Sequence, residues 1–395
     1  MVDITGEFEK INIKVYECKS GDRYFDPIRK MFLCMTPEEL VRQKMIVYLQ
    51  EKLGVNPAKM FVEDHLIHYG VEDINGRIDI SILKEGNEPL AVAECKEPKI
   101  SVRGLQVYTQ AAEYAAAIHA EYVILVNGLE IAFYKLNSGV YEPIDGILTY
   151  EEMLGGAGEE PEGSAFSRFT MEQYHDLEFL KSQEWYLEKI GADTEAYKIP
   201  AIINLDDCLI DESHILKGKL TKNLEVMDDL GVGFLNYNDA SGGGFGSAYY
   251  RLLLMNDLEK KKQFICGFTI IATGKMVNDS KYGNRDGLTV LVVSRNDGDY
   301  DEMSVKINLN KFLDVVEDKM ILTHNAAVTR KGATKHAVMN YVESKAPGIV
   351  KDGKIQLGEV DVSRPLFLDN PDVKEMVGKL VEYSIYRDEY KHQLK

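Results

Sequence analysis

The first 150 residues alternate helical and strand-like hydrophobic patterns, and this alternation restricts the fold more than any other feature of the sequence. Residues 36–54 carry apolar side chains at helical spacing, with Thr36 as N-cap, Pro37 in the first turn and Gly54 at the end. Six further segments follow: three strand-like segments, a second helical one and two more strand-like ones. They cover residues 59–70, 76–83, 89–95, 101–120, 122–128 and 130–136. This order predicts a mixed sheet flanked by helices, an α/β layer structure.

At 395 residues, the chain is longer than one hydrophobic core comfortably accommodates. Residues 155–165 read GGAGEEPEGSA, a small, acidic and proline-containing composition that is typical of a linker. We therefore expect an N-terminal domain at residues 1–154 and a C-terminal domain at residues 166–395. In the second domain, one long helix is predicted at 169–191 and shorter helices at 333–345 and 371–390. Strand-like segments dominate the rest and predict a β-rich α+β domain, at residues 199–205, 248–255, 263–274, 287–295 and 304–309.

Composition narrows the class of protein. No apolar run is long enough to span a bilayer, and the acidic N-terminus is unlike a signal peptide, so we expect a cytoplasmic protein without a membrane partner. The five cysteines are scattered and never form a C-x-x-C pair, which argues against a disulfide framework and a zinc ribbon. The net charge of −18 opposes loose binding to nucleic acid, so DNA binding would need a local basic groove or a bound metal.

Two acids, Asp79 and Glu94, lie within segments that otherwise resemble buried strands. A hairpin symmetric about Gly86-Asn87 would place Asp79 opposite Glu94 and Leu83 opposite Leu90. Like charges facing each other destabilise a sheet unless a cation lies between them, and paired carboxylates suit magnesium. Lys96 falls on the same strand face as Glu94 and could offset charge on a phosphate. The simpler interpretation of Asp79, Glu94 and Lys96 is a salt bridge on a half-exposed sheet.

Six ordered segments strengthen the catalytic interpretation: TPEELVRQKMIVYL, VEDHLIHYG, GRIDISIL, AVAECKEPK, QAAEY and VILVNG. Over about residues 30–150 they resemble the N-terminal nuclease domain of type I restriction endonuclease R subunits and related PD-(D/E)xK nucleases. The resemblance implies a restriction-endonuclease-like fold with Asp79, Glu94 and Lys96 as catalytic residues. It implies Mg²⁺, replaceable by Mn²⁺, held by Asp79, Glu94 and the backbone carbonyl of Cys95.

Four further residues are candidates for roles at the site, and two interpretations stay open for all of them except Glu63. Gln110 and Tyr114 match a Q-x-x-x-Y element and share a helix face, so the resemblance implies contact with DNA; the alternative is a tyrosine packed in the core. Glu39 could support the metal, but Thr36-Pro37-Glu38-Glu39 also spells a capping box, which is the favoured interpretation. Glu63 matches an acid frequent in the family and is a second candidate for a supporting role.

The chain departs from full-length R subunits because it contains no G-x-x-x-x-G-K-[ST] motif, so no ATP site is expected. The glycine-rich segment 241–247 precedes a strand-like segment, which favours a hairpin loop over a phosphate loop. The sequence predicts a magnesium-dependent DNA endonuclease of restriction or defence type, with a C-terminal domain that recognises DNA, a protein partner or an effector. The alternative is a catalytically silent nuclease fold that serves as a binding or regulatory module and docks a protein partner. The oligomeric state and the recognised DNA sequence stay open.

Overall fold

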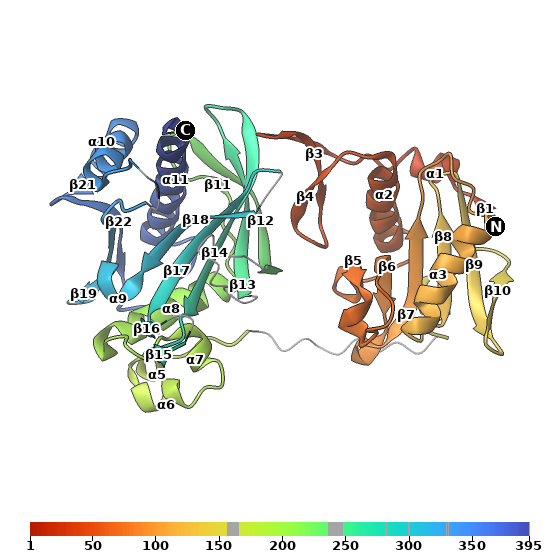
Figure 1. Cartoon of the computed structure of the whole chain (residues 1–395), viewed down its shortest axis with the longest axis horizontal. Coiled ribbons are helices and arrows are strands. Elements are labelled where there is room, and N and C mark those ends of the chain that lie inside the picture. The colour runs from red at the N-terminus through yellow and green to blue at the C-terminus, as the bar shows by residue number, and fades with distance from the viewer. Residues whose placement is uncertain are drawn as a thin grey trace. The chain divides into compact units, whose positions relative to one another are not determined.

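The computed structural model divides the chain into two compact units, Met1–Ser164 and Ala165–Lys395. In Figure 1 the first unit runs from red to yellow and the second from green to blue. The structure describes residues 1–155, 166–235, 248–280, 283–298, 301–328, 330 and 332–394. All of the predicted linker beyond Gly155 lies outside the described residues, and so does the glycine-rich segment 241–247.

The first unit is built on a mixed seven-stranded sheet in the order β1-β9-β8-β7-β6-β5, with β10 paired to β9. Its strands are β1 (Val2–Asp3), β5 (Met60–His65), β6 (Arg77–Leu83), β7 (Pro89–Cys95), β8 (Tyr122–Val126), β9 (Glu130–Asn137) and β10 (Val140–Ile144). Strands β7 and β8 are parallel, whereas the other neighbours are antiparallel. A parallel pair needs a crossover connection, and α3 (Leu105–Ala117) supplies it.

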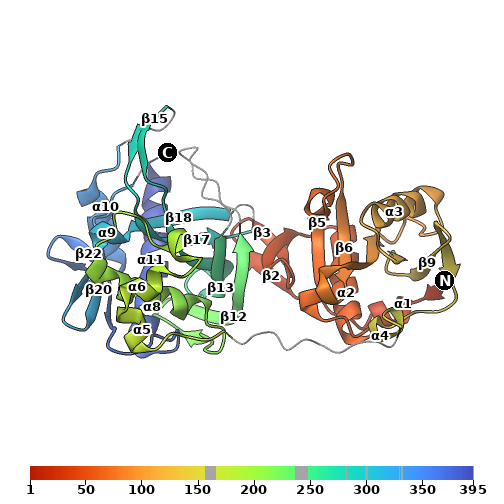
Figure 2. The ribbon, with the colours of Figure 1, turned by 90° about the horizontal axis from the view of Figure 1, so that it is seen from below.

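Helices cover both faces of this sheet (Figure 2). Ile124 and Val126 of β8 belong to the apolar cluster of α2 (Pro37–Glu51), whereas Val123 and Leu125 belong to that of α3. Because side chains alternate along a strand, burial of both faces explains why β8 is an unbroken apolar run. The sequence thus correctly predicted a mixed sheet with helices on its faces.

Small elements complete the first unit. The three-stranded sheet β2-β3-β4 is separate from the main sheet, and its first strand ends within the tripeptide Glu17-Cys18-Lys19, which has the same residues as Glu94-Cys95-Lys96. Glu17 in that tripeptide is exposed, whereas Cys18 is buried. These elements are α1 (Thr5–Phe8), β2 (Val15–Cys18), β3 (Gly21–Asp26), β4 (Met31–Cys34), α4 (Tyr150–Met153) and 3₁₀ turns at Pro57–Lys59, Leu66–Tyr69 and Glu85–Asn87.

The hairpin formed by β6 and β7 follows the predicted register over most of its length. Ile80 pairs with Ala93 and Ile82 with Ala91, as a hairpin centred on Gly86-Asn87 requires. The prediction that Leu83 faces Leu90 is wrong, because a register shift next to the turn pairs Leu83 with Pro89. Proline has no N–H to give to a ladder, which makes a strand end beside a bulge a tolerant place for it.

The second unit is β-rich, as predicted. Its largest sheet has six strands in the order β11-β12-β13-β14-β17-β18, and a four-stranded sheet follows the order β19-β20-β22-β21. The strands are β11 (Gly218–Lys219), β12 (Leu224–Leu235), β13 (Ala248–Asp257), β14 (Lys262–Ala272), β15 (Met276–Asp279), β16 (Gly283–Arg285), β17 (Thr289–Asn296), β18 (Asp301–Asn308), β19 (Leu313–Val316), β20 (Lys319–His324), β21 (Val350–Lys351) and β22 (Lys354–Asp361).

Helices pack against these sheets around one large apolar cluster, which joins residues such as Ile202, Ile270, Leu322 and Val381. The helices are α5 (Met171–His175), α6 (Leu177–Lys181), α7 (Tyr186–Lys189), η4 (Ala196–Lys198), α8 (Ile199–Ile210), α9 (Leu309–Phe312), α10 (Lys335–Lys345) and α11 (Pro371–Gln393). Among the described residues no helix combines the length and the apolar character needed to cross a membrane.

Two predictions for the second unit are wrong. The single helix expected at 169–191 is three short helices, because the Asp176 carboxylate accepts the Glu178 and Phe179 N–H groups and so starts a new helix at α6. The strand expected at 199–205 is the first half of α8, which is buried on most of its surface. A short, fully buried apolar run does not distinguish strand from helix by periodicity.

Candidate active site

The candidate site begins with the N-terminal turn of α2. Thr36 caps this helix, with its Oγ1 accepting the Glu39 N–H at 3.0 Å, and Pro37 occupies the first turn. The cap sets the helix phase so that Glu39 and Arg42, one turn apart, are both buried. The predicted reciprocal capping bond from Glu39 is wrong, because its carboxylate accepts hydrogen bonds from Gln43 Nε2, at 2.9 Å, and from Arg42 Nη1.

Arg42 gathers the acids of the site around one guanidinium group. Its Nη2 lies 2.7 Å from Asp79 Oδ1 and 2.7 Å from Glu63 Oε1, and its Nη1 binds Glu39. Burial alone would lower the pKa of Arg42, but the charges of Asp79 and Glu39 outweigh it and raise that pKa. Sequence reasoning did not single out Arg42, although its spacing of three from Glu39 on a capped helix was a usable signal.

Glu63 lies in β5 with a left-handed backbone, at φ +54°. Its carboxylate is held on one oxygen by Arg42 and on the other by Arg77 Nη1, at 2.9 Å. A non-glycine residue in this conformation costs about 1–3 kcal/mol, and the two guanidinium contacts help to hold it there. The fold therefore brings Glu63 to the site, where both of its carboxylate oxygens contact arginine side chains.

Asp79 lies where β6 and β7 separate. The ladder between these strands ends at Ile80 and Ala93, while β7 continues along β8 through a 2.8 Å hydrogen bond from the Lys96 N–H to the Val126 carbonyl. The Asp79 carboxylate occupies the opening: its Oδ2 accepts the Cys95 N–H at 2.7 Å, and its Oδ1 accepts from Arg42. The carboxylate thus replaces the missing ladder partner.

Glu94 is the most deeply buried acid of the predicted site, with 2% of its surface exposed. Lys96 Nζ lies 2.5 Å from its Oε1, whereas its Oε2 is buried without a hydrogen-bond partner among the described residues. Burial and, next in size, the charge of Asp79 raise the pKa of Glu94 to about 7, against the opposing effect of Lys96. Among the described residues, the Glu94 carboxylate therefore has Lys96 as its hydrogen-bond partner on one oxygen and none on the other.

Lys96 is the member of the set that reaches solvent, with 20% of its side chain exposed. Burial alone would lower its pKa, but the hydrogen bond to Glu94 and the charges of Glu94 and Asp79 raise it. Its ammonium is therefore held in the charged form beside Glu94. The Cys95 thiol is completely buried within the α2-side core, where burial and then Asp79 raise its pKa.

Glu38 is a second residue that sequence reasoning missed. It is half-buried, and burial followed by the charge of Asp79 raises its pKa, while Lys96 and Arg42 oppose the shift. The charges of Asp79, Glu94, Lys96 and Glu38 thus act on one another at the end of the β6–β7 hairpin. Glu38 lies four residues before Arg42, and this spacing places both residues on the same face of α2, which could have indicated that Glu38 lies near the site.

The predicted substrate-binding residues lie on α3. Gln110 and Tyr114 are both half-buried, and Gln106, one turn earlier, is exposed. A side-chain carbon added to Gly76 would lie 2.5 Å from Tyr114 Oη, so the tyrosine ring covers the backbone just before β6. This packing agrees with the structural interpretation of Tyr114, because the ring supports the strand that carries Asp79.

The chemistry of these groups fits a divalent cation. Asp79 and Glu94 offer hard carboxylate oxygens, and Glu94 Oε2 has no hydrogen-bond partner among the described residues, so it can accept a proton or a cation. Magnesium in proteins commonly takes only one or two carboxylates and fills its other positions with water and substrate phosphate. Among the described residues, no group of three or more His, Cys, Asp and Glu side chains is arranged to hold a metal ion.

The fold and this site together define a class: an α/β domain with a buried Asp and Glu and a neighbouring Lys where two strands separate. Comparison with known families agrees with that description, since the family model for the type I restriction enzyme R protein N terminus matches residues 37–147. The match confirms the resemblance and covers α2, the β6–β7 hairpin and α3. No curated protein and no solved structure matches the chain.

Proposed function

We propose that the protein is a magnesium-dependent deoxyribonuclease of restriction or defence type whose first unit has a restriction-endonuclease-like fold. The observation that carries the proposal is the buried, unpartnered Glu94 Oε2, next to Asp79 and Lys96 and inside the region that matches the R protein family. A carboxylate oxygen buried without a partner costs several kcal/mol in principle, and a bound cation would remove that cost.

Asp79, Glu94 and the Cys95 backbone carbonyl would hold Mg²⁺, or Mn²⁺ in its place. The bound ion would supply positive charge against the charge that develops during phosphodiester hydrolysis. The Asp79 carboxylate is pre-oriented for this by the Cys95 N–H, which fixes one oxygen. Arg42, Glu39 and Glu63 form a supporting layer that holds Asp79 from the helix side.

Lys96 would act on the substrate side, because it combines solvent contact with a stabilised positive charge. Its ammonium can hold the attacking water or offset charge on the phosphate, which are interactions strongest in the transition state. Gln110, half-buried on α3, would contact DNA near the cleaved phosphate, and Tyr114 would keep β6 in place through Gly76.

The alternative is a nuclease fold without catalysis that docks a protein partner. One observation favours it: Arg42 already supplies a cation to Asp79 Oδ1, so that part of the acidic cluster is neutralised by the protein itself. The two functions differ in metal uptake, because a binding module has no need of a cation at Glu94.

The test is digestion of supercoiled plasmid by the intact protein with Mg²⁺, with Mn²⁺ and with EDTA, each with and without ATP. We expect nicking with either metal, none with EDTA and no effect of ATP. Calorimetric titration with Mn²⁺ should show binding that Asp79→Ala abolishes. Absence of both nicking and Mn²⁺ binding would leave the silent binding module as the function.

Lys96→Ala should remove nicking and leave Mn²⁺ binding largely in place, because the lysine acts mainly on the transition state. Its melting temperature, measured with Mn²⁺ bound, should change little, because the ion then compensates the Glu94 charge in place of the lysine. Lys99→Ala is the matched control, since Lys99 pairs with Glu97 and its side chain is exposed. Unchanged nicking by the Lys96 variant, or a collapse of its melting temperature, would return Lys96 to the salt-bridge interpretation.

A further inference from the structure

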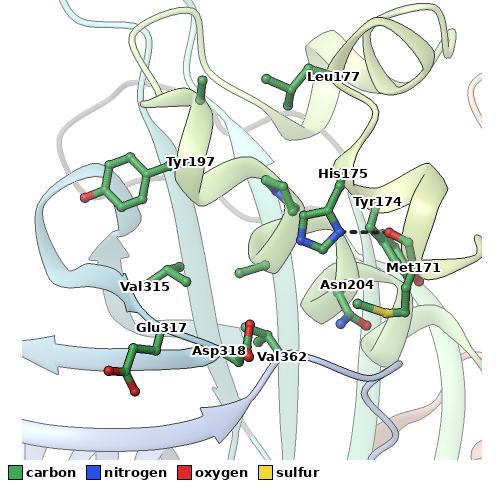
Figure 3. Close-up of a pocket in the computed structure, with 13 residues that line it drawn as sticks. Met171, Tyr174, His175, Leu177, Tyr197, Asn204, Val315, Glu317, Asp318 and Val362 are labelled. Carbon is green, nitrogen blue, oxygen red and sulfur yellow. Dashed lines mark hydrogen bonds between the residues drawn. The ribbon is translucent and has the colours of Figure 1, made fainter.

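The second unit contains a cavity of about 340 Å³ that is lined by residues of this unit. It lies between the helical segment formed by α5, η4 and α8 and the turn that joins β19 to β20 (Figure 3). Ligand pockets usually occupy about 300–1,000 Å³, so this volume suits a small molecule. Leu177, Val315 and Val362 supply apolar walls, and the ring of Tyr197 is 52% exposed beside them.

The buried polar side chains of this cavity form hydrogen bonds with other parts of the protein. Tyr174 Oη donates to Asp207 Oδ2 at 2.6 Å. Asn204 Nδ2 donates to the Arg364 carbonyl at 2.8 Å, and its Oδ1 accepts the Leu366 N–H at 2.9 Å. These side chains therefore shape the cavity without being free to select a ligand.

The remaining polar groups are acceptors. His175 Nδ1 lies 2.8 Å from the Met171 carbonyl, which can only accept, so Nδ1 carries the proton and leaves Nε2 of the neutral ring as an acceptor (Figure 3). Tyr197 Oη donates to Asp314 Oδ1 at 2.9 Å and keeps only its acceptor capacity. The carboxylates of Glu317 and Asp318 complete the set.

No lysine or arginine is present among the described lining residues. Two cations nearby have carboxylate partners of their own: Lys198 Nζ lies 2.5 Å from Glu195, and Lys319 Nζ lies 2.6 Å from Glu359. Lys198 Nζ also lies 5.4 Å from the centroid of the Tyr197 ring, so one face of that ring already has a cation beside it. A cavity with apolar walls, an exposed aromatic ring and acceptors only is complementary to a hydrogen-bond donor that carries positive charge.

We propose that this cavity, which we call the cation pocket, binds a small organic cation of amine or amidine type on a flat apolar body. The charged group pairs with Asp318 and Glu317, and the apolar body packs on Val315 and the ring of Tyr197. The pocket would give the second unit an effector site, and it is independent of the nuclease function proposed for the first unit.

The probe is benzamidine, a planar ring with an amidinium group, and benzoate is the matched anion on the same ring. Both are titrated calorimetrically into the intact protein. Trp185 is the only tryptophan of the chain, and it stacks on Phe169, which contacts Tyr174 edge-on, so its fluorescence reports on the pocket. We expect saturable binding of benzamidine with a change in that fluorescence, and no detectable binding of benzoate.

Asp318→Asn and Tyr197→Ala should each weaken benzamidine binding at least about fivefold, the size of one lost charge contact or one lost contact between aromatic rings. Asp352→Asn is the control, because it makes the same charge change at an exposed turn that does not line the pocket. Melting temperatures establish that the variants fold. The proposal is overturned if benzamidine shows no saturable binding at millimolar concentrations, if benzoate binds equally well, or if the folded Asp318 and Tyr197 variants bind like the control.

Discussion

At the residue scale, the candidate active site contains two positively charged side chains that differ in burial and in the number of acids they contact. Arg42 is almost completely buried and contacts Asp79, Glu39 and Glu63, whereas Lys96 contacts Glu94 and reaches solvent. The strand acids and Lys96 could be proposed from the sequence, because a hairpin has period two and a definable centre. The spacing of Arg42 from Glu39 indicated that pair, but its contacts with Glu63 and Asp79 could not be recognised from one sequence, because these acids are brought to it from β5 and β6 by the fold.

Arg42→Gln should destabilise the protein by about 3–5 kcal/mol in the absence of metal, because it leaves buried carboxylates without their cation. Mn²⁺ should restore more stability to this variant than it adds to the wild type. Without the guanidinium group, the carboxylates attract the metal ion more strongly. The measurement is urea unfolding with and without Mn²⁺. Arg77→Gln is the control, since Arg77 contacts Glu63 from the exposed side. Equal stabilisation by Mn²⁺ in all three proteins would contradict this role of Arg42.

Glu94 should make stability depend on pH. Its pKa is raised by burial and Asp79 from 4.5 to about 7 in the folded state, so the folded protein binds the proton more tightly than the unfolded chain does. Stability from this group is then fully present below about pH 4.5 and is lost as the pH rises to about 7. Glu94→Gln should remove that loss, a difference of about 3 kcal/mol at pH 8 without metal.

The measurement is urea unfolding of the wild type and the variant between pH 5 and pH 8, with EDTA present. Because Asp207 also has a raised pKa, near 6, only the difference between the two proteins isolates Glu94. Glu88→Gln, at an exposed position of the same hairpin, should follow the wild type. A wild-type minus Glu94→Gln difference that stays constant with pH would show that Glu94 is already charged and compensated.

At the element scale, the sequence predicted best where local signals and tertiary environment agree. The cap at Thr36 and Pro37 defined α2, and alternation with the Gly86-Asn87 turn defined the β6–β7 register as far as Ile82. Prediction failed at 169–191, where Asp176 restarts the helix, and at α8, where burial on most sides removes the helical period. At Asp176 the decisive information is a local side-chain cap, and at α8 it is the surroundings of the segment; hydrophobic periodicity contains neither.

The contact between α3 and the start of β6 gives a prediction about packing. Gly76→Ala should cost about 1–3 kcal/mol, because the new Cβ would overlap the Tyr114 ring. Adding Tyr114→Ala should make the glycine substitution nearly neutral, so the two effects should be strongly non-additive. Gly6→Ala is the control, since nothing lies within 4 Å of its Cβ position. Additive effects in a double-mutant cycle from urea unfolding would contradict the assigned contact.

At the scale of the whole molecule, each unit has its own core. The largest apolar cluster draws only on residues 174–386, and the other two draw only on residues 4–153. The segment between them was expected to be a linker from its composition, and the proposed chemistry divides in the same way, with metal in the first unit and an organic cation in the second. We propose accordingly that the second unit recognises a target or effector. The catalytic residues proposed for the first unit interact only with a phosphodiester and a metal, neither of which carries sequence information.

Separate cores predict separate unfolding transitions, because cooperativity depends on shared buried contacts. Calorimetry of the intact chain should show two transitions. Glu94→Gln should shift only one of them, and Val381→Ala, which removes buried methyl groups from the second core, should shift only the other. Mn²⁺ at about 100 times its dissociation constant should raise the melting temperature of the first unit by roughly 5–10 °C. Benzamidine should raise only the melting temperature of the second unit. A single transition moved by both substitutions and by both ligands would mean that the units unfold as one, and metal binding in the first would then be thermodynamically coupled to ligand binding in the second.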